Sequence, residues 1–196
     1  DGNLRLIPTN RTNSSYIWDD RYNSEVNKYY GINNYNLSRM KDSLLFLYEN
    51  TNENEGVVYF SDLQRSYIIN HDVCVGSRSL TDTDINSNTE CKQVVSQKVG
   101  LLNITDYYSA STSTGCITTD NLECNNYNYL YSFSYNTFAT TIPSSENTYS
   151  YLTISAGTIN QVRTTKGYRI YPIIYLDSEI LYLAGDGSIS NPYQIR

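Results

Sequence analysis

Apolar side chains recur at helical spacing after Asn36, which predicts an amphipathic helix in the first quarter of the chain. The apolar positions are Leu37, Met40, Leu44, Leu47 and Tyr48. Asn36 is expected to be the N-cap of this helix. A shorter helix is predicted to begin at Ser24-Glu25-Val26, with Ser24 as its N-cap and Gly31 as its C-terminal stop. The chain is therefore expected to carry two early helices.

The second half of the chain reads mainly as strands. Tyr149–Ile154 and Thr158–Val162 flank a Ser-Ala-Gly turn, which predicts a hairpin in which Gly157 has a positive φ. Tyr168–Leu176 is apolar at nearly every position and is expected to be a central, buried strand. Pro172 within it indicates an edge, a bulge or the start of the strand. Shorter expected segments are strands at Leu4–Pro8 and Val99–Ile104, a helical turn capped by Thr105-Asp106 that carries Tyr107, Tyr108 and Ala110, and apolar runs of either type at Val57–Phe60 and Tyr67–Ile69.

Aromatic and polar residues alternate between Tyr127 and Phe138. In a strand, Tyr127, Tyr129, Tyr131, Phe133 and Tyr135 would share one face. One interpretation is a core face, because alternating apolar residues normally point inward. The other is a surface that stacks against sugars or a partner protein, since tyrosine offers area and a hydroxyl at low entropy cost. The 21 tyrosines exceed what a core of this size should need, so at least one of Tyr127, Tyr129, Tyr131 and Tyr135 is predicted to be exposed.

Composition favours one extracellular domain spanning residues 1–196. The chain has 17% charged residues and a net charge of −6 with no basic run, which argues against nucleic acid and anionic membranes as partners. No apolar stretch approaches the ~18 residues of a membrane span, and no signal peptide is visible. The chain starts inside an apparent strand, so we expect that an upstream first-strand segment or anchor has been removed.

The four cysteines fall into two local pairs, Cys74 with Cys91 and Cys116 with Cys124, and each pair brackets a polar loop. This spacing predicts two intrachain disulfides in an oxidising compartment. Free or metal-bound thiols are the alternative. A zinc site is hard to assemble, however, because the chain has one histidine and no Cys-x-x-Cys motif.

Oxygen-bearing side chains recur between the first two cysteines, at spacings that could wrap a Ca²⁺ ion. The positions are Asp82, Asp84, Asn86, Asn88 and Glu90. The EF-hand pattern itself fails, because Ser87 stands where glycine is required and Gln93 where a bidentate glutamate is required. A solvated loop tied by Cys74–Cys91 is the alternative, and no other cofactor is indicated.

Two further groups carry potential catalytic chemistry. His71 is followed by Asp72, but the chain has no Gly-x-Ser-x-Gly nucleophile turn, which favours a surface histidine. Trp18-Asp19-Asp20 places two carboxylates beside a ring, as a glycosidase could use. Neighbouring residues rarely face one cleft, so a structural role is the favoured interpretation.

The end of the chain resembles the terminal block of extracellular modules from low-GC Gram-positive bacteria, in the formylglycine-generating-enzyme-like branch of the C-type-lectin folds. The resemblance rests on Gly167–Leu176 and on Gly185-Asp-Gly-Ser-Ile-Ser-Asn-Pro-Tyr193. Further matching segments, in the same order along the chain, are Asp1–Ile7, Trp18–Ser24, Asn36–Arg39, Val99–Leu102, Asp106–Ser111, Tyr127–Leu130 and Asn136–Pro143. Tyrosine or phenylalanine replaces the tryptophans of that group, and Tyr171 intervenes in its Arg-Pro step.

The resemblance implies an α+β, C-type-lectin-like fold with two early helices, a twisted and mostly antiparallel sheet, and long disulfide-tied loops. The reactive cysteine pair of the formylglycine-generating enzymes is not matched, so no activity is carried over. We expect a non-enzymatic module of the bacterial cell surface that binds a glycan or a surface protein. The alternatives are a subunit that self-associates into a filament or surface layer and, more distantly, a glycosidase-like enzyme.

Overall fold

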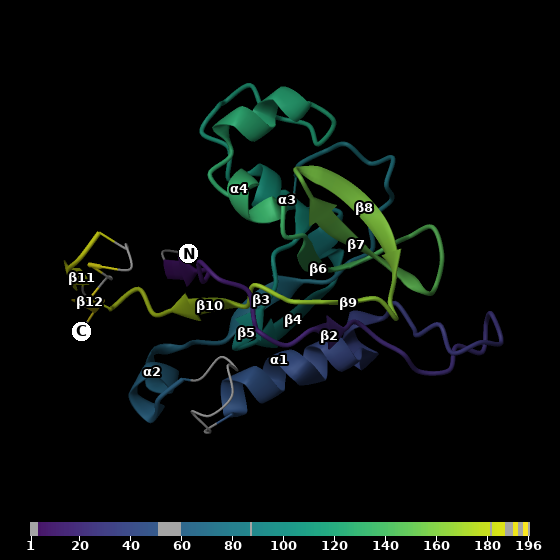
Figure 1. The fold of residues 1–196 in the computed structure, drawn as a ribbon, viewed down its shortest axis with the longest axis horizontal. Coiled ribbons are helices and arrows are strands. Elements are labelled where there is room, and N and C mark those ends of the chain that lie inside the picture. The colour runs from purple at the N-terminus through teal and green to yellow at the C-terminus, as the bar shows by residue number, and fades with distance from the viewer. Residues whose placement is uncertain are drawn as a thin grey trace.

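The computed structural model describes residues 4–50, 60–86, 88–180, 182–186, 190–191 and 194–195. Within these ranges the architecture is α+β, and every pair of named strands is antiparallel. Figure 1 shows the long helix along the lower side, a hairpin at the upper right and both chain ends at the left. The helices are α1 (Arg39–Glu49), α2 (Asp62–Tyr67), α3 (Ile104–Tyr108) and α4 (Tyr131–Ser134), with 3₁₀ turns η1 (Tyr35–Leu37), η2 (Glu90–Lys92) and η3 (Leu122–Tyr127).

The strands form small sheets rather than one continuous sheet. Two sheets have three strands each: β1 (Leu4–Leu6), β10 (Ile173–Leu176) and β5 (Val99–Gly100); and β6 (Phe138–Pro143), β7 (Ser150–Ser155) and β8 (Thr158–Arg163). Three are pairs: β2 (Tyr16–Ile17) with β9 (Gly167–Tyr168), β3 (His71–Cys74) with β4 (Val94–Gln97), and β11 (Tyr182–Ala184) with β12 (Gln194–Ile195). Because many strands have only two to four residues, side-chain packing between the sheets must hold the fold together.

Helix α1 supplies one wall of the larger core. Ser38 begins it, and its hydroxyl accepts a hydrogen bond from the backbone of the first turn at 3.2 Å. Met40, Leu44 and Leu47 lie on one face and are buried, as their spacing predicts. The backbone N–H of Met40 also donates to the carbonyl of Trp18 at 3.0 Å, so the helix start is fixed to the segment after β2.

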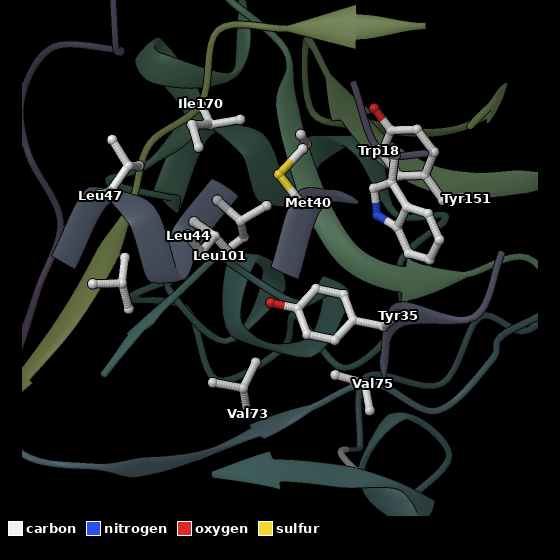
Figure 2. Close-up of a cluster of buried hydrophobic side chains, with 12 residues drawn as sticks. Trp18, Tyr35, Met40, Leu44, Leu47, Val73, Val75, Leu101, Tyr151 and Ile170 are labelled. Atoms are coloured by element: carbon white, nitrogen blue, oxygen red, sulfur yellow. The ribbon is translucent and has the colours of Figure 1, made fainter. Parts of the chain in front are cut away.

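Trp18 is fully buried in this core, beside Tyr151 (Figure 2). Its ring stacks on Tyr151 with centroids 5.3 Å apart and meets Tyr35 edge-on at 6.1 Å. Its indole N–H donates to the carbonyl of Thr140 at 3.2 Å, which satisfies the polar end of the buried ring. Trp18 therefore joins the N-terminal segment, η1 and the β6–β7 sheet.

A second core lies between α3 and the β6–β7–β8 sheet. Tyr107 from α3 packs against Phe138 from β6, with ring centroids 5.9 Å apart, and Ile142 and Ile154 are buried in the same cluster. Ile173 of β10 belongs to this cluster as well. Strand β10, the central strand of the first sheet, thus packs side chains into the second core.

The predicted hairpin is confirmed. Strands β7 and β8 pair in register from Ser150 opposite Arg163 to Ser155 opposite Thr158. Gly157 has φ +72°, as predicted, and Ala156 also has a positive φ of 47°. Two adjacent residues with positive φ match the twist of a two-residue hairpin.

The predicted strand at Tyr168–Leu176 is central but interrupted. It divides into β9 and β10, and Pro172 directly precedes β10, so the proline marks the start of a strand. Strand β10 is the middle strand of its sheet, as expected. Ile170, Ile173 and Leu176 are buried, whereas Ile174 is only half-buried.

The helix predicted at Ser24–Gly31 is wrong. The chain forms a turn there, closed by a bridge between Asn23 and Lys28. The buried side chain of Asn23 accepts from the N–H of Glu25 at 3.0 Å and donates to the carbonyl of Gly31 at 2.8 Å. These bonds give the backbone a local alternative to a helix. The second early helix is α2 instead, which a capping box of Ser61 and Gln64 begins.

Smaller boundary predictions also change. Ser38, not Asn36, caps α1, and Leu37 is exposed. Strand β5 covers only the first two residues of the range predicted at Val99–Ile104. Asn103, not Thr105-Asp106, caps α3. Residues 1–3 and 57–59, together with several residues of the terminal block from 187 onward, lie outside the described residues, so expectations for them stay untested.

The centrality of β10 can be tested with Ile173→Ala. Ile173 is 1% exposed, so the substitution should lower the free energy of unfolding by about 2–5 kcal/mol through lost burial and a residual cavity. Chemical denaturation with both disulfides intact measures the change. Ile117→Ala is the matched control, because Ile117 is 67% exposed and should change stability by less than about 0.5 kcal/mol. Equal midpoints for the two variants would contradict the placement of β10.

Candidate functional site

A polar cleft of about 520 Å³ lies between two chain segments. One wall is formed by residues 33–36, which lead into η1, and the other by residues 143–148, which connect β6 to β7. Ser77 and Gln93 also line it. We call this hollow the amide cleft, because asparagine, glutamine and hydroxyl side chains line most of it.

Asn33 holds the two walls together. Its side-chain amide donates to the carbonyl of Ser144 at 2.8 Å and to that of Asn147 at 2.5 Å. Its backbone N–H donates to the carbonyl of Thr148 at 2.9 Å. These three bonds join segments more than 110 residues apart in the sequence, so the cleft is a built feature and not a gap between mobile loops.

The lining of the amide cleft is nearly neutral. Its charged member is Glu146, whose carboxylate accepts a hydrogen bond from the hydroxyl of Ser79 at 2.6 Å. Side-chain amides and hydroxyls can both donate and accept hydrogen bonds without a net charge. Such a lining suits a hydroxyl-rich ligand, which offers the same neutral donors and acceptors.

The segment of alternating aromatic and polar residues is not a strand. Its residues form η3, a short loop and α4, because the side chain of Asn128 interrupts any extended run. Asn128 donates to the carbonyl of Tyr107 at 2.7 Å and accepts from the N–H of Leu130 at 2.8 Å. The tyrosines therefore do not share one face of a pleated strand.

Tyrosine exposure is nevertheless confirmed in this segment. Tyr127, Tyr129 and Tyr135 are 54%, 66% and 65% exposed, and Tyr131 is half-buried against Tyr135 with ring centroids 5.2 Å apart. We call these four residues the tyrosine patch. They belong to η3, to α4 and to the residues just before and after α4, and η3 also contains Cys124 of the second disulfide. Sequence reasoning found this patch from the tyrosine excess alone.

Both predicted disulfides are confirmed, Cys74–Cys91 and Cys116–Cys124, and no free cysteine remains. They indicate an oxidising, extracellular milieu. Among the described residues, no helix has the length and apolar character needed to cross a membrane.

The loop proposed for calcium wraps an internal cation instead. The fully buried guanidinium of Arg78 pairs with the carboxylate of Glu90 at 2.8 Å, and it also donates to the carbonyls of Asp82, at 3.0 Å, and Asp84. Glu90 is itself fully buried and accepts from the N–H of Thr105 at 3.1 Å. Arg78 thus lies inside the loop that was considered for a metal ion, where it is bound by Glu90 and by backbone carbonyls.

The other calcium candidates are used within the loop. The carboxylate of Asp82 accepts from the N–H of Asp84, that of Asp84 from the N–H of Asn86, and the side chain of Asn86 from the N–H of Asn88. This succession of turns explains the alternating acid and amide pattern, because such side chains cap the backbone two residues on. The pattern is therefore a signal of loop structure.

A second, charged cleft of about 300 Å³ lies beside β1, β3 and α3. Its lining includes Arg5, which pairs with Asp106 at 2.5 Å, and His71, whose ring stacks on Tyr175 with centroids 3.5 Å apart. Burial lowers the pKa of His71. Arg5 lowers it further, while Asp72 and Asp106 oppose the shift. His71 thus stacks on an aromatic ring and is half-buried, so the surface histidine expected from the sequence is only partly exposed.

Trp18-Asp19-Asp20 does not form a carboxylate pair. Asp19 is fully buried, where it accepts from Arg21 at 2.8 Å and from the N–H of Ile32 at 2.7 Å. Asp20 faces the surface and pairs with Arg39. The two side chains point to different surroundings, so the structural interpretation of this motif is supported.

Sequence reasoning missed the amide cleft, because its walls come from distant segments without a motif. The available signals were the polar runs Asn33-Asn34 and Ser144–Thr148, which read only as loops. Comparison of the chain with known protein families, with curated proteins and with solved structures found no match.

Substitution of Glu90 tests the internal cation. Glu90→Gln should lower the free energy of unfolding by about 3–5 kcal/mol, because it removes the carboxylate closest to a fully buried guanidinium. The exposed Glu123→Gln is the matched control and should have little effect. Thermal and chemical denaturation measure both variants. Millimolar calcium should leave the midpoint of the unmodified protein unchanged, and a calcium-dependent rise would contradict the assignment of Arg78 to the centre of the loop.

His71 is the one histidine of the chain, so its titration can be followed directly by NMR. Its pKa should lie below 6.5, because burial disfavours the imidazolium. A lowered folded pKa stabilises the protein above pH 6.5, and this contribution is lost as the pH falls through the folded value. Stability measured between about pH 7 and 5 should fall less in His71→Asn than in the unmodified protein. A titration midpoint at or above 6.5 would contradict this environment.

Proposed function

We propose that the chain is a non-enzymatic binding module of the bacterial cell surface, that the amide cleft is its ligand site, and that the ligand is a glycan. The module would belong to the C-type-lectin-like, formylglycine-generating-enzyme-like architecture that the terminal block resembles. Two disulfides, antiparallel sheets and long loops are compatible with that architecture.

The observation that carries the proposal is the neutral, hydrogen-bonding lining of a cleft of about 520 Å³. A pocket for a small apolar ligand would be lined mainly by hydrophobic side chains. A sugar presents hydroxyls at every position, and amides from Asn34, Asn36 and Gln93 can pair with them. The bonds of Asn33 fix the two walls relative to each other before any ligand arrives, which reduces the entropy cost of binding.

We propose that the chain is not an enzyme because its candidate acids and bases are held in ion pairs or ring contacts. Asp19, Glu90 and Asp106 are engaged in ion pairs with arginines. Asp20 pairs at the surface, and His71 stacks on Tyr175. A glycosidase needs two carboxyl groups facing each other across one substrate cleft. The amide cleft has one carboxylate in its lining, Glu146.

The tyrosine patch favours a second candidate function, which is self-association into a filament or surface layer or contact with a surface protein. Tyr127, Tyr129 and Tyr135 are each more than half exposed, and tyrosines are enriched at interfaces because they bury area at low entropy cost. Sedimentation of the purified protein tests this candidate in the same samples that are used for binding. Concentration-dependent assembly that is lost in Tyr129→Ser would favour it.

The cleft proposal is tested by Ser77→Trp. Ser77 is exposed and lines the cleft, so the added ring should fill the cleft without removing a core contact. A panel of soluble polysaccharides, neutral and acidic, is screened first, and calorimetry then measures the affinity for those bound. We expect Ser77→Trp to weaken binding at least about tenfold, which corresponds to about 1.4 kcal/mol.

Ser14→Trp is the matched control, because Ser14 is also exposed and does not line the amide cleft. Both variants should melt like the unmodified protein. Polysaccharide binding that Ser77→Trp leaves intact would place the site elsewhere, and failure of the unmodified protein to bind any polysaccharide would contradict the glycan proposal.

A further inference from the structure

We propose that the ligand of the amide cleft is an acidic glycan, whose carboxylate or phosphate groups are held by a basic, tyrosine-lined surface beside the cleft. This surface consists of Lys28, Tyr30, Tyr149 and Arg163, and we call it the basic tyrosine cluster. The inference rests on the proposed function, because it names the chemical class of the ligand of that same site.

The cluster is organised around the ring of Tyr30. The ammonium of Lys28 lies 5.1 Å from the centre of this ring, and the guanidinium carbon of Arg163 lies 4.6 Å from it. The ring of Tyr149 packs against Tyr30 with centroids 5.5 Å apart. Aromatic faces attract cations, so the rings fix the two positive charges at the surface.

Three chain segments build the cluster, and Thr164 ties them together. The fully buried Thr164 donates its N–H to the carbonyl of Tyr149 at 3.0 Å and its hydroxyl to the carbonyl of Tyr30 at 2.5 Å. Arg163 is the last residue of β8 and directly precedes it. The positions of the charged groups therefore depend on buried hydrogen bonds and not on surface side chains alone.

The cluster adjoins the amide cleft along the chain. Tyr149 follows Thr148, which lines the cleft and whose carbonyl accepts hydrogen bonds from the N–H of Asn33 at 2.9 Å and from the side chain of Asn23 at 3.1 Å. Asn23 in turn forms the base of the turn that ends at Lys28. A polymer that leaves the cleft past Thr148 would meet the cluster next.

The two cations have no carboxylate partner within the described ranges. Neither Lys28 nor Arg163 takes part in an ion pair, whereas Arg5, Arg21, Arg39, Arg65 and Arg78 all do. Both approach the same ring, so the two charges lie within about a Debye length of each other. An anion between or beside them would relieve their repulsion and gain two favourable interactions.

An acidic glycan fits this surface better than an anionic membrane does. Membrane attraction needs clusters of about four to eight basic residues, and here the chain carries a net charge of −6. Tyr22 and Tyr29 on the same turn are 45% and 75% exposed and contact each other edge-on at 5.3 Å. Exposed rings next to isolated cations suit sugar rings that carry a single acid group each.

The test compares one polymer in two charge states, polygalacturonate and its methyl ester, with the unmodified protein and with Lys28→Gln/Arg163→Gln. We expect the protein to bind polygalacturonate more tightly than the ester, and added salt should narrow the difference. The double variant should lose about tenfold in affinity for polygalacturonate, since two exposed charge contacts are removed. Its affinity for the ester should stay the same.

Lys41→Gln is the control for the loss of a positive charge elsewhere on the surface, because Lys41 lines a separate cleft with Leu45 and Tyr48. A double variant that binds polygalacturonate as the unmodified protein does, or equal affinity for acid and ester, would overturn the inference. If either outcome is found but Ser77→Trp still blocks binding of the ester, the proposed glycan site in the amide cleft stands and only the preference for an acidic glycan is lost. Tight binding to vesicles containing phosphatidylglycerol, without preference for polygalacturonate, would overturn it in favour of a membrane surface.

Discussion

The buried guanidinium of Arg78 is the constraint on which much of the structure depends. Its side chain is neutralised by Glu90 and enclosed by carbonyls of the loop within the first disulfide. Its backbone bonds to the wall of the amide cleft formed by residues 143–148. The N–H of Arg78 donates to the carbonyl of Pro143 at 3.0 Å, and its carbonyl accepts from the N–H of Ser145 at 2.9 Å. Because Glu90 also accepts from Thr105, one residue joins the cystine loop, the cleft wall and helix α3. A buried charge is tolerated only when such partners surround it.

Short strands make these polar connections necessary. With pairs such as β2–β9 and β3–β4, the backbone ladders alone cannot hold the sheets in one arrangement. Trp18 supplies the apolar counterpart, since its ring stacks on Tyr151 and its N–H reaches Thr140. Buried threonines and asparagines, such as Thr164 and Asn23, then fix the irregular segments by bonds to backbone carbonyls. This explains how a chain rich in Asn, Ser and Thr forms ordered loops.

The two proposed recognition features have different physical bases. The amide cleft offers neutral hydrogen-bonding groups on two walls that Asn33 joins, which favours selectivity through geometry. The basic tyrosine cluster offers charge, which acts at longer range and weakens with salt. The tyrosine patch near α4 is built differently again, by Asn128 and the second disulfide, and offers apolar area with hydroxyls. Separate segments of one small domain thus provide distinct surfaces.

The sequence by itself determined the features that depend on local spacing. The face of α1 follows from the spacing of Met40, Leu44 and Leu47, the hairpin turn from Gly157, and both disulfides from cysteine proximity. Tertiary structure decided the rest, because competing local bonds or distant partners were involved. The side-chain bonds of Asn23 stabilise a turn where a helix was predicted. The guanidinium of Arg78 lies inside the loop that was considered for calcium. The amide cleft and the basic tyrosine cluster exist only after folding, since their residues are brought together from segments more than 100 positions apart.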